Sequence, residues 1–318
     1  MSVIGASSLD VYPLCLGTNS FGWTADKDAS HKILDEYTGA GGNFLDTADV
    51  YTAWVPGGKG GESERIIGSW LANRRRDEVV LATKVAKLPG YRGLSPQNVR
   101  TCAEASLGRL GTDYIDLYYA HEFDSRIPVA ESVAAFADLQ RAGLIREVGL
   151  SNFTADQIHE WVHHADDQGV PRPVALQPHY NLVWREPFES ELQPVAEQYD
   201  LGVMPYWSLA AGLLTGKYKS AEDIAGDRAS SVRQHASPRA FAVAQAITEI
   251  ADGINVEPSA VAIAWLLTNP VVTAPIASAR NADQVPPLLE GVSITLTDEE
   301  LESLNSLSAG LGDASADR

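Results

Sequence analysis

Four polar residues of complementary chemistry end or follow three successive β-type runs in the first half of the chain. Asp46 ends the run NFLD and is followed by Tyr51, Lys84 ends VVLATK, and His121 follows IDLYYA. A tyrosine has a pKa near 10 and is a weak acid at neutral pH unless a cation stabilises its phenolate. Lys84 would supply that cation, Asp46 would keep a buried lysine charged, and His121 would donate to a carbonyl oxygen as it gains negative charge. The four types suit carbonyl reduction, and the alternative is that each is an ordinary polar residue at a strand end.

The four side chains can form one site only if the fold brings the ends of their strands together. The sequence indicates such a fold, because short β-type runs alternate with longer helical runs along the chain. In the helical run 95–110, Ser95 is placed to cap the helix and Gly111 to stop it. The eight expected strands cover residues 14–17, 43–46, 79–84, 115–120, 147–151, 175–177, 202–206 and 271–276. The helices expected between and after them cover residues 29–40, 61–73, 95–110, 129–142, 154–168, 188–200, 237–253 and 282–290.

The alternation of strands and helices predicts a parallel sheet with right-handed crossovers, in the α/β class. A doubly wound dinucleotide-binding sheet would carry GxGxxG after its first strand, where this chain reads TNSFGW. The eightfold count therefore favours a (β/α)8 TIM barrel over residues 1–318 as one domain. Additions to the barrel are a strand-like N-terminal stretch, a long loop at 207–236, helices at 259–268 and 298–307, and a flexible acidic tail at 309–318.

Composition limits the classes of partner. The chain has 318 residues and a formal net charge of −18, which repels nucleic acid and anionic lipid surfaces overall. Two cysteines, Cys15 and Cys102, cannot build a disulfide framework, which is typical of a reduced cytosolic protein. The N-terminal sequence has no secretory signal pattern, and no apolar run reaches about 18 residues. We expect a cytoplasmic protein without nucleic-acid or membrane partners, and its oligomeric state is left open.

An ordered set of motifs resembles the aldo-keto reductase family over nearly the whole chain. The motifs are NFLDTADVY, GESERIIGSWL, VVLATK, YIDLYYAH, GLSNF, ALQPHYNL, LAAGLLTGKY and AVAIAWLLTNPVVTAPIASARNADQV. The resemblance implies that Tyr51 is the general acid and that Asp46, Lys84 and His121 are its partners. It also implies hydride transfer between NADP(H) and the carbonyl of an aldehyde or ketone, with a small-molecule carbonyl or alcohol as the substrate.

The same resemblance implies a set of cofactor contacts. Ser151, Asn152 and Gln177 match positions that hold the nicotinamide carboxamide, and Tyr206 matches the aromatic residue that stacks on the nicotinamide ring. The complete set of implied cofactor-binding residues is Ser151, Asn152, Gln177, Tyr206, Ser208, Leu209, Gly212, Lys217, Ser278, Arg280 and Gln284. Pro287 and Leu288 stand where many relatives carry a Glu-Asn pair that touches adenine.

Aromatic residues in loops on the expected catalytic side are candidates for an apolar substrate pocket. These are Trp23, Trp54, Phe123 and Trp184, and packing in the core is the alternative for each. A rival function keeps the fold but uses the nucleotide only for sensing, as a regulatory subunit resembling the potassium-channel β subunits. The presence of all four catalytic residue types favours turnover.

Two further motifs point to other chemistry and are set aside. His159 and His163 fall in HEWVH, a match to the HExxH zinc motif. The helix that carries them would lie on the outside of a barrel, far from the catalytic face, so we expect surface histidines and no metal site. The segment GLLTGK has only three residues between its glycines and no Ser or Thr after Lys217, so it is not a Walker phosphate loop.

Overall fold

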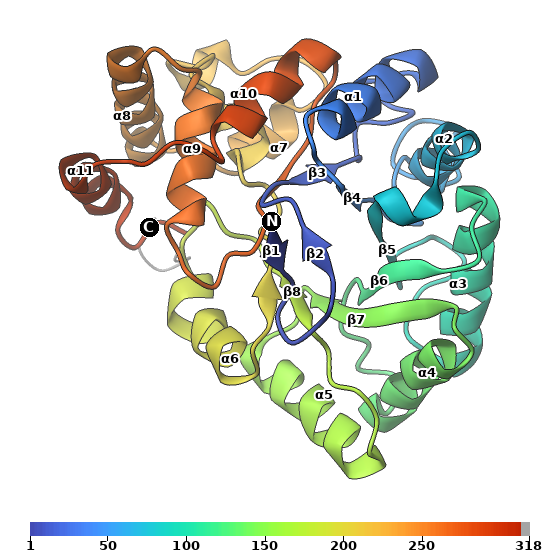
Figure 1. Ribbon diagram of the computed structural model, residues 1–318. Helices are drawn as coiled ribbons and strands as arrows, with labels where there is room; N and C mark the ends of the chain where they lie inside the picture. Colours follow the sequence, from blue (N-terminus) through green and yellow to red (C-terminus); the bar gives the residue numbers. More distant parts are fainter. Residues whose placement is uncertain (313–318) are drawn as a thin grey trace.

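The structure, a computed structural model, describes residues 1–312 and places eight short parallel strands in one curved sheet at its centre (Figure 1). Each strand pairs in parallel with the next one around the sheet. In this order the strands are β10 (Ile276–Ala277), β3 (Cys15–Gly17), β4 (Phe44–Asp46), β5 (Val80–Val85), β6 (Ile115–Ala120), β7 (Ile145–Ser151), β8 (Ala175–Gln177) and β9 (Gly202–Val203).

The sheet closes between its first and last strands. The amide of Thr273 donates to the carbonyl of Val203 at 2.9 Å, and the amide of Ile276 donates to the carbonyl of Pro205 at 2.9 Å. Val203 also forms a parallel bridge with Val272. These bonds join β9 to the segment that enters β10, so the predicted (β/α)8 barrel is confirmed.

Helices surround the sheet on its outer side (Figure 1). Their ends follow local chemistry: the Ser95 side chain accepts the amide of Asn98 at the start of α3, and Gly111 ends that helix with a φ of 65°. The helices of the ring are α1 (Lys27–Gly39), α2 (Glu62–Leu71), α3 (Pro96–Leu110), α4 (Val129–Arg141), α5 (Ala155–Gln168), α6 (Gln193–Gln198), α9 (Pro258–Leu267) and α10 (Val285–Glu290). A π-helical turn at Phe188–Leu192 leads into α6.

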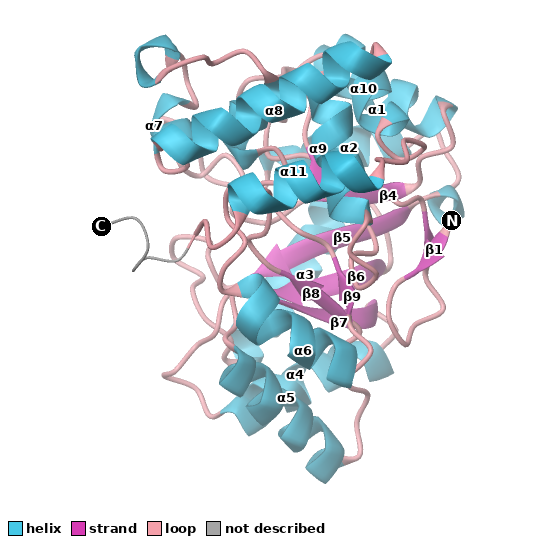
Figure 2. Cartoon of the chain, turned by 90° about the vertical axis from the view of Figure 1, so that its left-hand side faces the viewer, coloured by secondary structure: helices cyan, strands magenta, loops and turns pink. Residues whose placement is uncertain are grey.

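Two helices near the C-terminus exchange the roles expected for them. The sequence pattern placed the helix at 237–253 in the ring and treated 259–268 as an addition. In the structure α9 is buried at every residue from Ala260 to Leu266, and α8 (Pro238–Ile254) packs over it together with α11 (Asp298–Ser308) (Figure 2). The inner position suits α9 because a helix that is apolar on every side is most stable when it is fully buried.

The N-terminal extension closes one end of the barrel. Strands β1 (Ser2–Val3) and β2 (Asp10–Val11) pair antiparallel, as a small hairpin in front of the barrel in Figure 1. Ile4 and Leu9 from this hairpin pack with Phe44 and Leu117 in an apolar cluster inside the barrel. The interior is therefore apolar at the N-terminal ends of the strands, which leaves the opposite end for polar side chains.

Several boundaries differ from those expected. The last two strands are shorter than predicted because Pro205 and Pro275 lack the N–H that a regular ladder requires. The expected loop at 207–236 contains α7 (Ala229–Arg233) and the 3-10 turns Ala210–Thr215 and Ala221–Asp223. Leu311 is 2% exposed and its carbonyl accepts the amide of Arg185 at 2.8 Å. The prediction that a flexible tail begins at residue 309 is therefore wrong for Leu311, which is packed against the protein. The rest of the predicted tail, residues 313–318, lies outside the described part of the chain.

Within residues 1–312, no single helix combines the length and apolar character that a membrane crossing needs. The consecutive helices α8 and α9 meet that criterion only as a pair, with a bend of 102° between them.

Candidate active site

Three of the four sequence-predicted catalytic residues form one hydrogen-bonded cluster. Asp46 ends β4, Lys84 lies near the end of β5, and Tyr51 follows in the loop after β4. Lys84 Nζ donates to Asp46 Oδ2 at 2.6 Å, to Tyr51 Oη at 2.9 Å and to the carbonyl of Thr47 at 2.8 Å. Tyr51 Oη in turn donates to Asp46 Oδ2 at 3.2 Å. Lys84 is 0% and Asp46 1% exposed, so this ion pair is buried.

The cluster continues through amides and hydroxyls on the neighbouring strands. Gln177 Nε2 donates to Asp46 Oδ1 at 2.8 Å, and Ser151 Oγ donates to the carbonyl of Gln177 at 3.0 Å. Asn152 Nδ2 donates to Ser151 Oγ at 3.0 Å, and Tyr206 Oη donates to Asn152 Oδ1 at 2.9 Å. A chain of hydrogen bonds therefore connects Tyr206, Asn152, Ser151 and Gln177, the residues predicted to contact the nicotinamide, to the Asp46 carboxylate.

His121 joins the site through its backbone. Its carbonyl accepts Asn152 Nδ2 at 2.8 Å, and its amide donates to the carbonyl of Val85 at 2.9 Å. The imidazole is 9% exposed, and Nδ1 is buried without a partner among the described residues. Burial, with Lys84 and Lys87 nearby, lowers the pKa of His121 well below its usual value. The ring is therefore neutral at physiological pH and carries one N–H that it can donate.

The environment of Tyr51 favours its protonated form. Burial and the neighbouring Asp46 carboxylate raise the pKa of Tyr51 well above its usual value. The sequence predicted that Lys84 makes the phenol more acidic, but in the structure burial and Asp46 have the larger effect on the pKa of Tyr51. Tyr51 thus holds its proton until a stronger base, such as a developing alkoxide, approaches it.

A cavity of about 710 Å³ opens at the C-terminal ends of the strands, where Asp46, Tyr51 and His121 reach its wall. Lys84 lies behind Tyr51 and does not line the cavity. All the residues to which the sequence assigned cofactor binding line it: Ser151, Asn152, Gln177, Tyr206, Ser208, Leu209, Gly212, Lys217, Ser278, Arg280 and Gln284. The volume lies in the range of small-molecule and cofactor sites.

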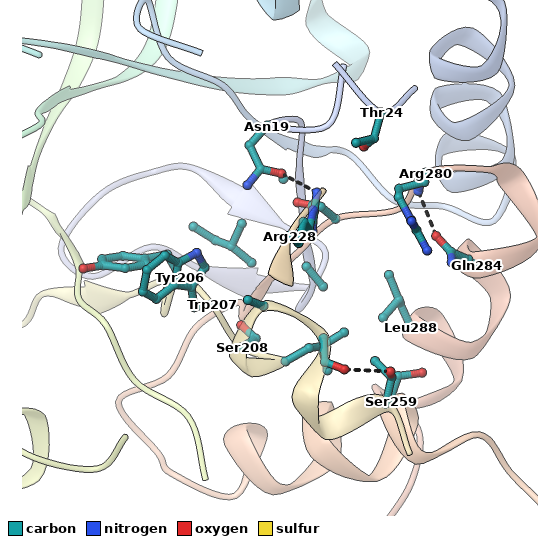
Figure 3. Close-up of a pocket in the computed structure, with 18 of the residues that line it drawn as sticks. Asn19, Thr24, Tyr206, Trp207, Ser208, Arg228, Ser259, Arg280, Gln284 and Leu288 are labelled. Atoms are coloured by element: carbon teal, nitrogen blue, oxygen red, sulfur yellow. Dashed lines mark hydrogen bonds between the residues drawn. The ribbon is translucent and has the colours of Figure 1, made fainter. Parts of the chain in front are cut away.

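Three cations line the part of this cavity away from the catalytic cluster. They are Lys217, Arg280 and Arg228, and Figure 3 shows Arg228 between Tyr206 and Arg280. None of them forms an ion pair with a carboxylate of the described residues. Burial, followed by the charge of Arg280, lowers the pKa of Lys217 and of Arg228. Asp227, Glu257 and Asp283 also line the cavity, but cations that form no ion pair remain available to an anionic ligand.

Sequence reasoning missed Arg228. Its Nη2 donates to Asn19 Oδ1 at 3.4 Å, and its Nε is buried without a partner among the described residues. The segment around it has no periodic pattern, and the available signal was its place after the strand that leads to Tyr206, which puts it at the same end of the barrel. Lys217 was found, and its ammonium reaches Gly212, where a Cβ would stand 3.0 Å from Nζ and where φ is +107°. A glycine fits both constraints at that position.

The four aromatic residues proposed for the substrate pocket separate into two groups. Trp54 lines the cavity and packs edge-on against the Tyr51 ring, with centroids 5.9 Å apart. Trp23, Phe123 and Trp184 do not line it, and each of their rings packs against another ring. Their neighbours are Trp54 for Trp23 at 5.9 Å, Phe153 for Phe123 at 5.5 Å, and His179 for Trp184 at 4.5 Å. The cavity also has Lys87 and Trp207 in its lining, which the sequence did not single out.

Tyr206 rests on a stack of rings. His179 lies nearly parallel to it at 5.3 Å and 17°, and Trp184 stacks on the other side of His179 at 15°. His235 approaches the edge of this stack at 5.1 Å from His179. Tyr206 is thereby backed on one side while it lines the cavity.

The HEWVH segment lies on α5, in the outer ring. His159 Nδ1 is 2.7 Å from Tyr199 Oη, and His163 Nε2 is 3.3 Å from Asp167 Oδ2. The described residues contain no group of three or more His, Cys, Asp or Glu side chains arranged to hold a metal ion.

Comparison with known proteins identifies the family of the chain. The sequence model of the aldo/keto reductase family matches residues 13–309. Uncharacterized oxidoreductase YrpG of Bacillus subtilis is 35% identical, with 97% of this chain and 96% of that protein covered. Norsolorinic acid reductase stcV of Emericella nidulans is 31% identical, with 93% of this chain and 78% of that protein covered.

A third relative carries a different kind of name. It is a Schizosaccharomyces pombe protein with the provisional name voltage-gated potassium channel subunit beta, 32% identical over 96% of this chain and 92% of that protein. The family match spans nearly the whole chain and includes every strand of the barrel. The chain belongs to the aldo/keto reductase family of oxidoreductases.

Proposed function

We propose that this protein is a cytoplasmic oxidoreductase that transfers a hydride between NADP(H) and the carbonyl of an aldehyde or ketone. The observation that carries the proposal is the Tyr51 hydroxyl, which bridges the Lys84 ammonium and the Asp46 carboxylate at the wall of the cavity. A phenol held in this way can give its proton to a substrate oxygen while a buried cation stabilises the phenolate left behind.

The residues that line the cavity fit a phosphorylated nicotinamide dinucleotide. Lys217, Arg228 and Arg280 are cations without carboxylate partners in the described chain, and the unpartnered Arg228 Nε is a free donor for a phosphate oxygen. At the other end, Ser151 and Asn152 offer hydroxyl and amide groups to a carboxamide. When bound, the nicotinamide supplies the hydride that no side chain of the protein can supply.

The extra phosphate of NADPH is the reason to prefer it over NADH. Phosphate is a dianion, and guanidinium groups bind it through paired, charge-assisted hydrogen bonds. Arg280 and Ser278 line the same part of the cavity, and the resemblance to the family assigns them to the 2′-phosphate. Pro287 and Leu288 also line it, so the adenine would meet apolar side chains there.

The proton chemistry follows from the geometry of the protein alone. A carbonyl oxygen held between Tyr51 Oη and the neutral His121 ring would receive two hydrogen bonds, which strengthen as that oxygen gains charge. Tyr51 then transfers its proton to the oxygen, and the Lys84 ammonium, 2.9 Å from Oη, balances the phenolate. The Asp46 carboxylate, 2.6 Å from Lys84 Nζ, pairs with this buried cation.

A turnover assay tests the proposal. Loss of NADPH absorbance is followed with a panel of aldehydes and ketones, and the Tyr51→Phe protein serves as the control for side reactions. Reduction of at least one carbonyl by the wild type, lost in the variant, is the expected result. Absence of turnover on the entire panel would contradict the proposed reaction.

A nucleotide-sensing regulatory role is the second candidate, favoured by the relative whose provisional name is a channel β subunit. It requires the same nucleotide site but no turnover. Tight NADPH binding by fluorescence titration, combined with no reduction of any carbonyl, would support this role over catalysis.

A further inference from the structure

Lys87 is a charged residue of the cavity that the proposed proton transfer leaves without a role. It lies three residues beyond Lys84, just after β5, and it lines the same cavity as Tyr51 and His121. The carboxylate beside it is Glu122, with Nζ and Oε2 3.8 Å apart and side chains 31% and 43% exposed. Lys84 and Asp46 are 2.6 Å apart and buried. The charge of Lys87 is therefore weakly compensated, and Glu122 is not part of the cavity wall.

The surroundings of Lys87 place it near the catalytic groups. It lines the same cavity as Tyr51 and His121, and its nearest carboxylate belongs to Glu122, the residue that directly follows His121. Burial lowers the pKa of Lys87, and the charge of Lys87 contributes to the lowered pKa of His121. The cavity therefore has a cation beside the carbonyl-binding groups, in addition to Lys217, Arg228 and Arg280.

The backbone before Lys87 is held in an unusual conformation. Ala86 has a φ of +112°, a region that residues with a side chain rarely adopt, and it is fully buried. Its carbonyl accepts the amide of Gly93 at 2.9 Å, which fixes the turn. Such strain persists where the surroundings enforce it, and it is found often at functional sites. The turn directs the chain so that Lys87 reaches the cavity.

The wall near Tyr51 contributes the apolar part of the site. Trp54 is 48% exposed, lines the cavity and packs on the Tyr51 ring. Tyr51, Trp54 and Lys87 line the same cavity, so one small ligand with an apolar middle part can meet all three side chains.

We propose that Lys87 forms an anion subsite that selects aldehydes and ketones carrying a carboxylate at the far end of a short apolar spacer. The inference rests on the proposed carbonyl reduction. Because the whole protein has a net charge of −18, an anionic substrate gains nothing from long-range attraction, and local contact with Lys87 must provide the selectivity.

The test compares two aldehydes of nearly the same shape, 4-formylbenzoate and the neutral 4-formylbenzamide. Their kcat/KM values with NADPH are measured for the wild type, Lys87→Met, Glu122→Gln and Lys32→Met. Lys32 is an exposed lysine on α1 outside the cavity lining, so Lys32→Met makes the same chemical change elsewhere.

We expect the wild type to prefer the carboxylate by about tenfold, as a partly solvated charge-assisted hydrogen bond would give. Lys87→Met should bring this ratio close to one, and Lys32→Met should leave it unchanged. Glu122→Gln should increase the ratio, because the competing carboxylate is removed. Raising the salt concentration should lower it in the wild type.

Binding of 4-carbamoylbenzoate, a carboxylate without a reducible carbonyl, is measured by calorimetry with NADP⁺ present, so that the subsite is tested even without turnover. Weaker binding to Lys87→Met than to the wild type and Lys32→Met is expected. A wild-type ratio near one, or equal binding of 4-carbamoylbenzoate to wild type and Lys87→Met, would overturn the subsite. Reduction of neither aldehyde with binding that still depends on Lys87 would instead refute the proposed reaction and leave the subsite standing.

Discussion

Tyr51→Phe is the substitution that isolates the proposed acid with the least structural change. It removes one oxygen atom and two hydrogen bonds, the one from Lys84 Nζ and the one to Asp46 Oδ2. Lys84 keeps its bonds to Asp46 at 2.6 Å and to the carbonyl of Thr47 at 2.8 Å, so no buried charge is left without a partner. The edge-on contact with Trp54 involves the ring and should remain. Folding and nucleotide binding are expected to survive.

The chemical step should lose what general acid catalysis contributes. A positioned acid is worth roughly 10²–10⁴-fold in rate, which corresponds to about 3–5 kcal/mol of transition-state stabilisation. The measurement is single-turnover hydride transfer in protein already saturated with NADPH, because this rate excludes nucleotide binding and product release. NADPH affinity, measured on the same preparation, should differ from the wild-type value by less than about threefold.

A near-normal single-turnover rate in Tyr51→Phe would refute the assignment of Tyr51 as the acid. The proton would then have to come from another donor at the cavity wall, and His121 would be the next residue to test. A large rate loss accompanied by equal loss of NADPH binding would refute the structural argument instead, since it would show that the hydroxyl is needed for the site to form.

Three further predictions address the nucleotide, a buried acid and metals. Arg280→Ala should weaken NADPH binding by about 10- to 100-fold, as loss of a charge-assisted hydrogen bond does. In the same fluorescence titration NADH binding should stay nearly unchanged. Equal effects on the two nucleotides would remove the case for NADP(H). Asp49 is 0% exposed with both carboxylate oxygens unpartnered in the described chain, and burial raises its pKa to about 8. Because the folded pKa lies above the unfolded value of 3.8, the acid costs stability progressively between pH 4 and pH 8, so Asp49→Asn should gain unfolding free energy relative to the wild type over that range. Denaturant titrations at pH 5 and pH 8 check this, and a constant difference between the two proteins would contradict it. Chelators should leave carbonyl reduction unchanged, and activity that is lost with EDTA and restored by zinc would show that a metal is required.

The sequence predicted most of the barrel because eight short β-type runs alternate with helical runs along the chain. Asp46 and Lys84 could be placed this way, since a parallel barrel gathers the C-terminal ends of its strands at one face. The eleven cofactor positions followed from the family resemblance, and the structure gathers all of them around one cavity.

The direction in which loop side chains point could not be predicted from the sequence. Phe123 and Trp184 lie in loops where no period fixes which way a ring points. The Phe123 ring packs against Phe153, and the Trp184 ring stacks on His179. Arg228 was missed because the segment around it has no periodic pattern. The exchange of α8 and α9 had a readable signal, the continuous apolar run of α9, which indicated a fully buried helix.

The burial of Lys84 and Asp46 has a consequence for the order of events in a catalytic cycle. Both side chains are buried, so water does not reach Tyr51 from the side of Lys84. If Tyr51 is the acid, it must regain its proton from the cavity that it lines, which is also where the alcohol product lies. The site is then ready for another carbonyl only after the product has left and Tyr51 has been protonated again.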